Sequence, residues 1–127
     1  MFVQMQTLPP ALERLAKTPV LASEMPSGFS RVKIVRLAPN STLGTLGAVR
    51  VDFVSAHTIE SASYALLRTN AAALHLAQTE AKVNGGSLVR VRAAAVGRFA
   101  VAVAAETAAG ASSLLHLAVA HLRRSGA

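Results

Sequence analysis

The chain has 127 residues, 52% hydrophobic and 15% charged, which is the length of one domain and too apolar for an intrinsically disordered protein. The formal net charge is +7 at pH 7, which favours nucleic acid or acidic surfaces as partners. The chain has no cysteine, which excludes disulfides, thiolate nucleophiles and sulfur-rich metal sites.

The first expected element is a short helix over residues 7–19. Pro9 and Pro10 stand in its first turn, where proline is favoured because the N–H groups of that turn have no partner within the helix. Residues 22–29, ASEMPSGF, then carry proline and glycine close together, which predicts a turn.

Four strand-like segments follow, in two pairs. In each segment valine, isoleucine or phenylalanine alternates with charged or small residues, the period expected of a strand with one buried face. Residues 38–47 are rich in turn formers and join the first pair, whereas Val96-Gly97-Arg98 forms a tight turn in the second. The segments comprise residues 30–37, 48–56, 84–95 and 98–106.

Two longer helices complete the prediction. Residues 57–82 contain neither proline nor glycine, Thr58 is a suitable N-cap, and Asn84-Gly85-Gly86 is a suitable stop. Residues 106–126 form the last helix. The apolar stripe of the first of these helices comprises Ile59, Ala62, Leu66, Leu67, Asn70, Ala73, Leu74 and Ala77.

The predicted fold is a single α+β domain over residues 1–127, with an N-terminal helix and turn in 1–28 and the sheet and remaining helices in 29–127. The element order is αββαββα. Short connections favour antiparallel pairing, so we expect a two-layer sandwich with a four-stranded, mainly antiparallel sheet and helices on one face. A shift that superposes Gly47 on Gly97 also superposes similar hydrophobic patterns, which indicates a ββα pseudo-repeat.

The sheet face opposite the helices is the candidate binding surface. If the valines and phenylalanines of all four strands point inward, six cations share this face, with Asp52 as its only acid. Such a face can be merely solvated, can bind nucleic acid or another anionic ligand through phosphates, or can self-associate where valines and alanines make it flat. The six cations are Arg31, Lys33, Arg50, Arg90, Arg92 and Arg98.

The sequence shows no catalytic or metal-binding constellation. His116 and His121 are five residues apart on a helix, and metal-binding pairs prefer spacings of three or four. The six acids are spread singly along the chain. We therefore interpret the protein as a non-catalytic binding or interaction module without a cofactor, a homo-oligomer or the partner of another protein. An active site assembled from distant residues stays open as an alternative.

Two segments resemble a loose group of small, uncharacterised bacterial domains, mostly actinobacterial, some of them attached to lipoproteins or membrane sensors. SEMPSGF (23–29) is similar to their motif before the first strand, and residues 96–124 are similar to their closing strand and helix. The element order also resembles that of roadblock-type dimer modules, as an analogy of architecture. Neither resemblance implies catalytic residues.

No signal peptide is recognisable at the N-terminus, so a cytoplasmic location is the default expectation. The most apolar stretch, residues 96–122, is interrupted by Arg98, Glu106 and His116, so no membrane span is predicted.

Overall fold

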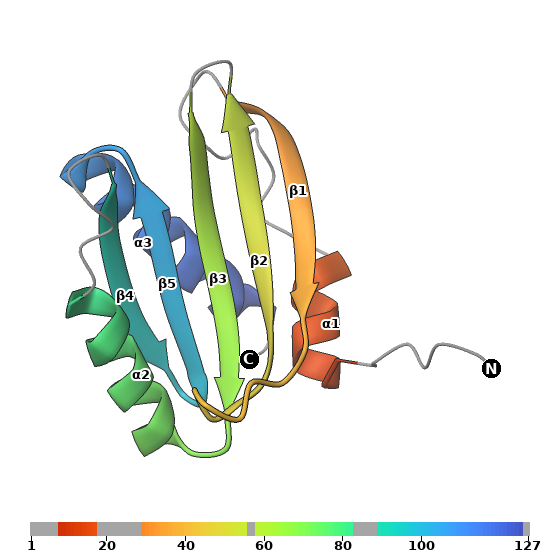
Figure 1. Ribbon diagram of the computed structural model, residues 1–127. Helices are drawn as coiled ribbons and strands as arrows, with labels where there is room; N and C mark the ends of the chain where they lie inside the picture. The colour runs from red at the N-terminus through yellow and green to blue at the C-terminus, as the bar shows by residue number, and fades with distance from the viewer. Residues whose placement is uncertain (1–7, 18–28, 56–57, 83–88, 126–127) are drawn as a thin grey trace.

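The computed structural model describes residues 8–17, 29–55, 58–82 and 89–125, which form three helices and a five-stranded sheet (Figure 1). The predicted α+β class and the predicted sequence of helices and strand pairs are confirmed, with one strand more than expected. In chain order the elements are α1 (Pro10–Lys17), β1 (Phe29–Leu37), β2 (Thr45–Ser55), β3 (Ile59–Leu67), α2 (Asn70–Lys82), β4 (Arg90–Val96), β5 (Phe99–Ala105) and α3 (Ala108–Arg124). The strands lie in the order β1-β2-β3-β5-β4, and all neighbours are antiparallel.

The additional strand is β3, whose residues the sequence prediction assigned to the long helix. Ala62, Tyr64 and Leu66 are buried on one face, whereas Ser61 and Ser63 are only partly buried on the other, which is the period of a strand. β3 lies inside the sheet and pairs with both β2 and β5. These two ladders outweigh the helical spacing of its apolar residues, so the prediction of four strands is wrong.

The shorter helix α2 has a different N-cap from the predicted one. The Thr69 hydroxyl accepts a hydrogen bond from the Ala72 N–H at 3.0 Å, which caps α2. Thr58 lies instead in the β2–β3 turn, where its N–H donates to the Ser55 hydroxyl at 3.1 Å. The predicted helix stop at 84–86 and all of the predicted 22–29 turn except Phe29 lie outside the described residues.

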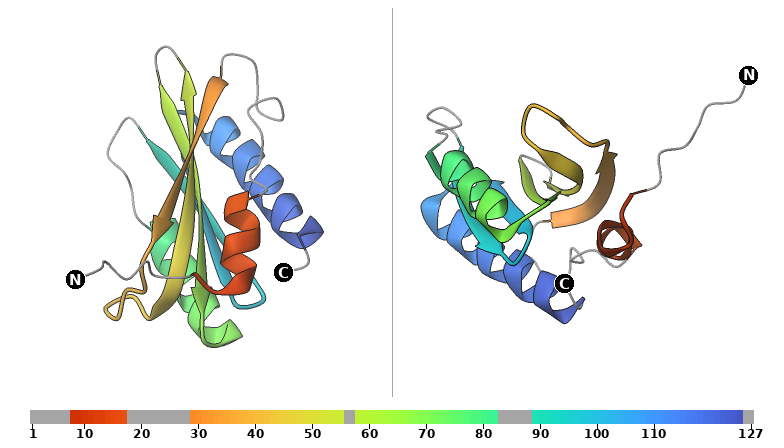
Figure 2. Two further views of the ribbon diagram at one scale, coloured as in Figure 1. Left: turned by 90° about the vertical axis from the view of Figure 1, so that its right-hand side faces the viewer. Right: turned by 90° about the horizontal axis from the view of Figure 1, so that it is seen from below.

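Helices cover both faces of the sheet, so the predicted two-layer arrangement is wrong (Figure 2). α1 and α3 pack on one face, here called the α1/α3 face, and α2 packs against β3, β4 and β5 on the opposite, α2 face. Alanine in the strands explains why the sequence did not predict this second helical layer, because its small side chain gives no sign of whether its face is covered. Under α2 lie Leu67 and Ala100, together with Ala65, Ala93 and Ala95.

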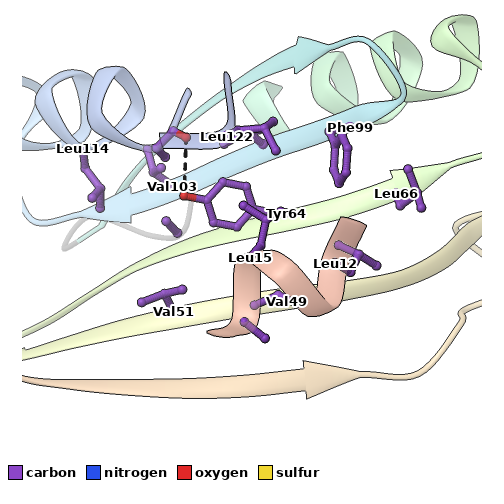
Figure 3. Close-up of a cluster of buried hydrophobic side chains, with 14 of the residues drawn as sticks. Leu12, Leu15, Val49, Val51, Tyr64, Leu66, Phe99, Val103, Leu114 and Leu122 are labelled. Carbon is purple, nitrogen blue, oxygen red and sulfur yellow. Dashed lines mark hydrogen bonds between the residues drawn. The ribbon is translucent and has the colours of Figure 1, made fainter. Parts of the chain in front are cut away.

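The main core lies on the α1/α3 face and takes most of the large buried side chains (Figure 3). Tyr64 is at its centre, 1% exposed, and its hydroxyl donates to the Ala118 carbonyl oxygen at 3.4 Å, which joins β3 to α3. Phe53 of β2 and Phe99 of β5 are also buried there. The three aromatic side chains that the structure describes therefore all serve the core.

The predicted ββα repeat is wrong. The shift of Gly47 onto Gly97 does superpose β2 on β5, and Gly97 does lie in a turn as expected. The same shift, however, places Ser63 and Leu67 of β3 on Ser113 and Leu117 of α3. A strand and a helix cannot be copies of one unit.

Candidate functional site

Lys33 and Arg50 lie where the sequence predicts, on the face that α1 and α3 do not cover. Val49 and Val51 of β2 are buried in the main core, so Arg50 between them points to the α2 face. Lys33 is exposed and pairs with Asp52 in the β1–β2 ladder, which places both on that face.

Arg90 and Arg92 lie on the opposite face, and this contradicts the predicted six-cation surface. They pair with Ala105 and Val103, which are buried in the main core, and directly paired residues of an antiparallel ladder project from the same face. Val91 consequently points to the α2 face. The reversed register is tolerated because β4 is the edge strand, where both arginines are exposed beside α3.

The remaining two cations do not restore a single surface. Arg98 lies in the β4–β5 turn, and its Nε donates to the Leu67 carbonyl oxygen at 3.0 Å. Arg31 belongs to β1, but its side chain lies outside the described part of the structure. The predicted basic surface is therefore divided between two faces and a turn.

Part of the α2 face has no helix over it, and this part is the candidate site. α2 packs over β4, β5 and the end of β3, whereas no described helix lies in front of β1, β2 and the start of β3 (Figure 1). We call this region the open face. It comprises Lys33, Val35, Arg50, Asp52, Val54, Ile59, Ser61 and Ser63.

The described side chains of the open face carry little net charge. Arg50 binds the Asp52 carboxylate with both Nε and Nη2, at 3.0 and 3.3 Å. The Asp52 side chain is only 14% exposed, whereas that of Arg50 is 42% exposed, so the carboxylate is the more shielded partner of this ion pair. Lys33 is then the one cation of the open face without an ion-pair partner among the described residues.

Sequence reasoning misses Ile59, Ser61 and Ser63 of the open face because it assigns their segment to a helix. Ile59 is 65% exposed, the most exposed large hydrophobic residue in the described part of the chain. The alternation Ser61-Ala62-Ser63-Tyr64 is the available signal for a strand. It is weak because serine and alanine occur readily in helices as well.

A second feature is a groove of about 550 Å³ beside the free edge of β4. On one side it is lined by β4, including Arg92, and on the other by α3, including Leu115 and His116. We call it the β4-edge groove. Its lining residues are Ala81, Val91, Arg92, Ala93, Ala94, Ser112, Leu115, His116 and Val119.

Two carboxylates that are far apart in the sequence approach each other near the start of α3. Burial, and secondly the negative charge of Glu106, raise the pKa of Glu60 above its ordinary value of 4.5. Thr107 caps α3 here, its hydroxyl accepting a hydrogen bond from the Gly110 N–H at 2.9 Å. Sequence spacing gives no sign of this proximity.

The histidines do not form a metal site in the described residues. No group of three or more histidine, cysteine, aspartate or glutamate side chains is placed there to hold a metal ion. His121 Nε2 is buried without a hydrogen-bond partner among these residues, and His57 lies outside them. None of the described helices is both long and apolar enough to span a bilayer.

Comparison with known proteins gives no match, either to a family model, to a curated protein or to a solved structure. The resemblance to small actinobacterial domains therefore stays a prediction. A function can therefore be inferred only from the geometry of this chain.

Proposed function

We propose that the protein is a non-catalytic interaction module that self-associates through the open face. The observation that carries this proposal is the unequal coverage of the sheet: helices bury the α1/α3 face, whereas α2 covers only part of the other. Ile59, 65% exposed, and the half-buried Val35 and Val54 lie in the uncovered part. Val54 and Ile59 are cross-strand partners, whereas the Lys33–Asp52 pair separates Val35 from them. Neighbouring exposed aliphatic side chains on a sheet are typical of a contact surface.

The shape of the open face suits a second sheet better than a small ligand. Its side chains are mostly short or β-branched, so they form a shallow surface instead of a pocket. Two such sheets pack face to face at about 10 Å. A symmetric dimer would bring the same residues of both copies together, which is the commonest form of self-association.

The charge of the open face favours a second copy as the partner. The chain carries +7 overall, so most of its surface repels an identical chain. Among the described side chains of the open face Asp52 neutralises Arg50, which leaves Lys33 as the one unpaired cation. Association through this face therefore costs less electrostatic repulsion than association through the arginines of β4.

The test is the molar mass in solution by light scattering, at low and at high salt. We expect twice the mass of one chain at both salt concentrations, because apolar contacts are not screened by salt. Val54→Glu places a charge beside Ile59, at the end of the open face next to the β2–β3 turn, and should give a monomer with an unchanged circular dichroism spectrum.

Leu74→Glu is the matched control. Leu74 is 50% exposed on α2, away from the open face, so this variant receives the same charge and should stay dimeric. A wild-type chain that is monomeric at its highest soluble concentration contradicts the proposal. A dimer that survives Val54→Glu contradicts it as well.

Binding of nucleic acid or another anionic ligand is the weaker alternative. It depends on six cations on one face, and the β4 register separates Arg90 and Arg92 from Lys33 and Arg50. Six neighbouring cations would bind phosphates far more tightly than separate pairs.

A further inference from the structure

β4 is a free edge of the sheet in the part of the chain that the structure describes. It pairs with β5 on one side and is the last strand in the sheet order. An edge strand presents unpaired N–H and C=O groups, with which an extended segment of another chain can form a ladder. Charged side chains often protect such an edge, so exposure alone does not identify a binding site.

The β4-edge groove distinguishes this edge from a merely protected one. Leu115 and Val119 of α3 are half-buried and line the groove together with Ser112 and His116. These four residues are spaced i, i+3, i+4 and i+7, which places them on one side of α3. A different side of α3, with Ala111, Leu114, Ala118 and Leu122, is buried against the sheet. α3 therefore presents a second, partly apolar stripe beside the edge.

The charges along β4 indicate the chemistry of a partner. Arg90 and Arg92 are exposed, and neither has an acidic partner among the described residues. On the opposite face of the same strand Val91 and Ala93 are partly exposed. A segment that paired with β4 would therefore meet the two arginines and the α3 stripe on one face, and small apolar side chains on the other.

We propose that the β4 edge binds an extended acidic segment of a partner protein, which adds to the sheet as a further strand. Acidic side chains of this segment contact Arg90 and Arg92. Its apolar side chains lie on the opposite face of the added strand and pack on Val91 and Ala93. The aliphatic parts of its acidic side chains lie beside Leu115 and Val119 of α3, on the same face as the two arginines. The ladder supplies affinity through main-chain hydrogen bonds, and the two arginines select for acidic residues.

A second copy of this chain is the less suitable occupant of this edge. Pairing β4 with itself would place Arg90 and Arg92 of both copies in one short ladder, without a described acid to neutralise them. The chain as a whole also carries +7. Strand addition at β4 does not depend on self-association through the open face, because the two surfaces share no residue.

The test uses the full chain and fluorescently labelled peptides of about ten residues, the length of a strand. One peptide alternates glutamate with valine, and a second has lysine in place of every glutamate. Fluorescence anisotropy at low salt should show binding of the glutamate peptide. The lysine peptide should bind at least about tenfold more weakly, which corresponds to about 1.4 kcal/mol.

Backbone methylation separates strand addition from simple charge attraction. N-methyl groups on alternate residues block the amides along one edge of the glutamate peptide and leave its charge unchanged. We expect one of the two methylation patterns to weaken binding at least about tenfold and the other to have little effect, since only one edge can face β4.

Substitutions in the protein test the contribution of the arginines. The double variant Arg90→Ala, Arg92→Ala should lose most of the affinity for the glutamate peptide, with an unchanged thermal unfolding curve. Arg68→Ala, combined with Arg123→Ala, removes the same charge from exposed positions outside β4 and should retain the affinity.

Three outcomes would overturn the proposal. The first is equal binding of the glutamate and lysine peptides, and the second is equal loss of affinity with both methylation patterns. The third is binding of a single-stranded oligonucleotide that depends on Arg90 and Arg92 while the glutamate peptide does not bind, which would make nucleic acid the ligand of this edge.

Discussion

The two faces of the sheet are made by the same five strands but carry very different side chains. On the α1/α3 face Phe53, Tyr64 and Phe99 are buried, with exposed fractions of 0, 1 and 5%. On the α2 face β3, β4 and β5 contribute mainly alanine and serine, and Leu67 is the largest strand side chain under α2. One face thus stabilises the fold, while the other is only partly closed.

This difference shows how the few large side chains of an alanine-rich chain are distributed between the two faces of its sheet. Burial of apolar area stabilises by about 25 cal/mol per Å², so concentrating the large residues on one face gives that face most of the stabilisation. The α2 face then needs fewer contacts and can leave β1 and β2 uncovered. A partly open sheet face is compatible with a stable domain for this reason.

The largest expected effect comes from the same substitution made on each face. Leu114→Ala, on α3 in the main core, should cost about 3–5 kcal/mol, because the surrounding large side chains cannot collapse into the cavity. Leu76→Ala, on α2 over strand alanines, should cost about 2 kcal/mol. Urea unfolding followed by circular dichroism measures both values.

Leu74→Ala is the control for helix propensity in this comparison. Leu74 lies on α2 but is 50% exposed, so its loss should change the free energy of unfolding by less than about 0.5 kcal/mol. Equal losses in the free energy of unfolding for Leu114→Ala and Leu76→Ala would contradict the view that the α1/α3 face supplies most of the stabilisation.

The next effect concerns the docking of α1 on the α1/α3 face. Gly47 of β2 has φ +148°, and a Cβ there would lie 3.1 Å from Leu12 and 3.2 Å from Leu8. Gly47→Ala should therefore cost about 1–3 kcal/mol from backbone strain and crowding together. The measurement is again urea unfolding.

Gly97→Ala provides the matched comparison. Gly97 also has a positive φ, +57°, but an added Cβ would have no heavy atom within 4 Å, so only backbone strain of about 1 kcal/mol is expected. If Gly97→Ala were the more costly change, close approach of α1 to β2 would not be what requires glycine at position 47.

Strict alternation made β1, β2 and β5 predictable from the sequence. Val49, Val51 and Phe53 alternate with polar residues, and their predicted inward register is the observed one. β3 was not predictable in the same way, because Ala62 and Ser63 suit a helix as well as a strand. Its identity depends on pairing with β2 and β5, which only the assembled sheet supplies.

The candidate site was predictable only in part: alternation alone gave a register for both edge strands, β1 and β4, and only that of β1 is the observed one. Lys33 and Arg50 follow from the alternation of β1 and β2, and both are on the expected face. The face that carries Arg90 and Arg92 could not be predicted in this way, because at an edge strand a long cationic side chain can reach water from either face. The predicted alternation in β4 is correct, but the ladder with β5 determines which sheet face carries the arginines.

The smallest effect concerns Glu60, a carboxylate at the rim of the α1/α3 face. Its surroundings disfavour the charged form, whereas Arg50 pairs with the charged Asp52 on the open face. Burial and then Glu106 raise the pKa of Glu60 above 4.5, so the folded state binds this proton more tightly than the unfolded state. The free energy of unfolding should consequently fall as the pH rises through the interval just above 4.5, and stay lower above it. Glu60→Gln removes this loss, so the variant should be more stable than wild type at pH 7, by less than about 1 kcal/mol because solvent screens the partly exposed carboxylate.

Urea unfolding of both proteins between pH 4 and pH 7 measures this difference, which should shrink toward the acidic end, where the wild-type carboxyl group is protonated. The gain from Glu60→Gln should also be smaller in a Glu106→Gln background, since one of the two causes of the raised pKa is then absent. The opposite result, a Glu60→Gln variant less stable than wild type at pH 7, would mean that the positive end of the α3 dipole stabilises the charged carboxylate more than burial and Glu106 destabilise it.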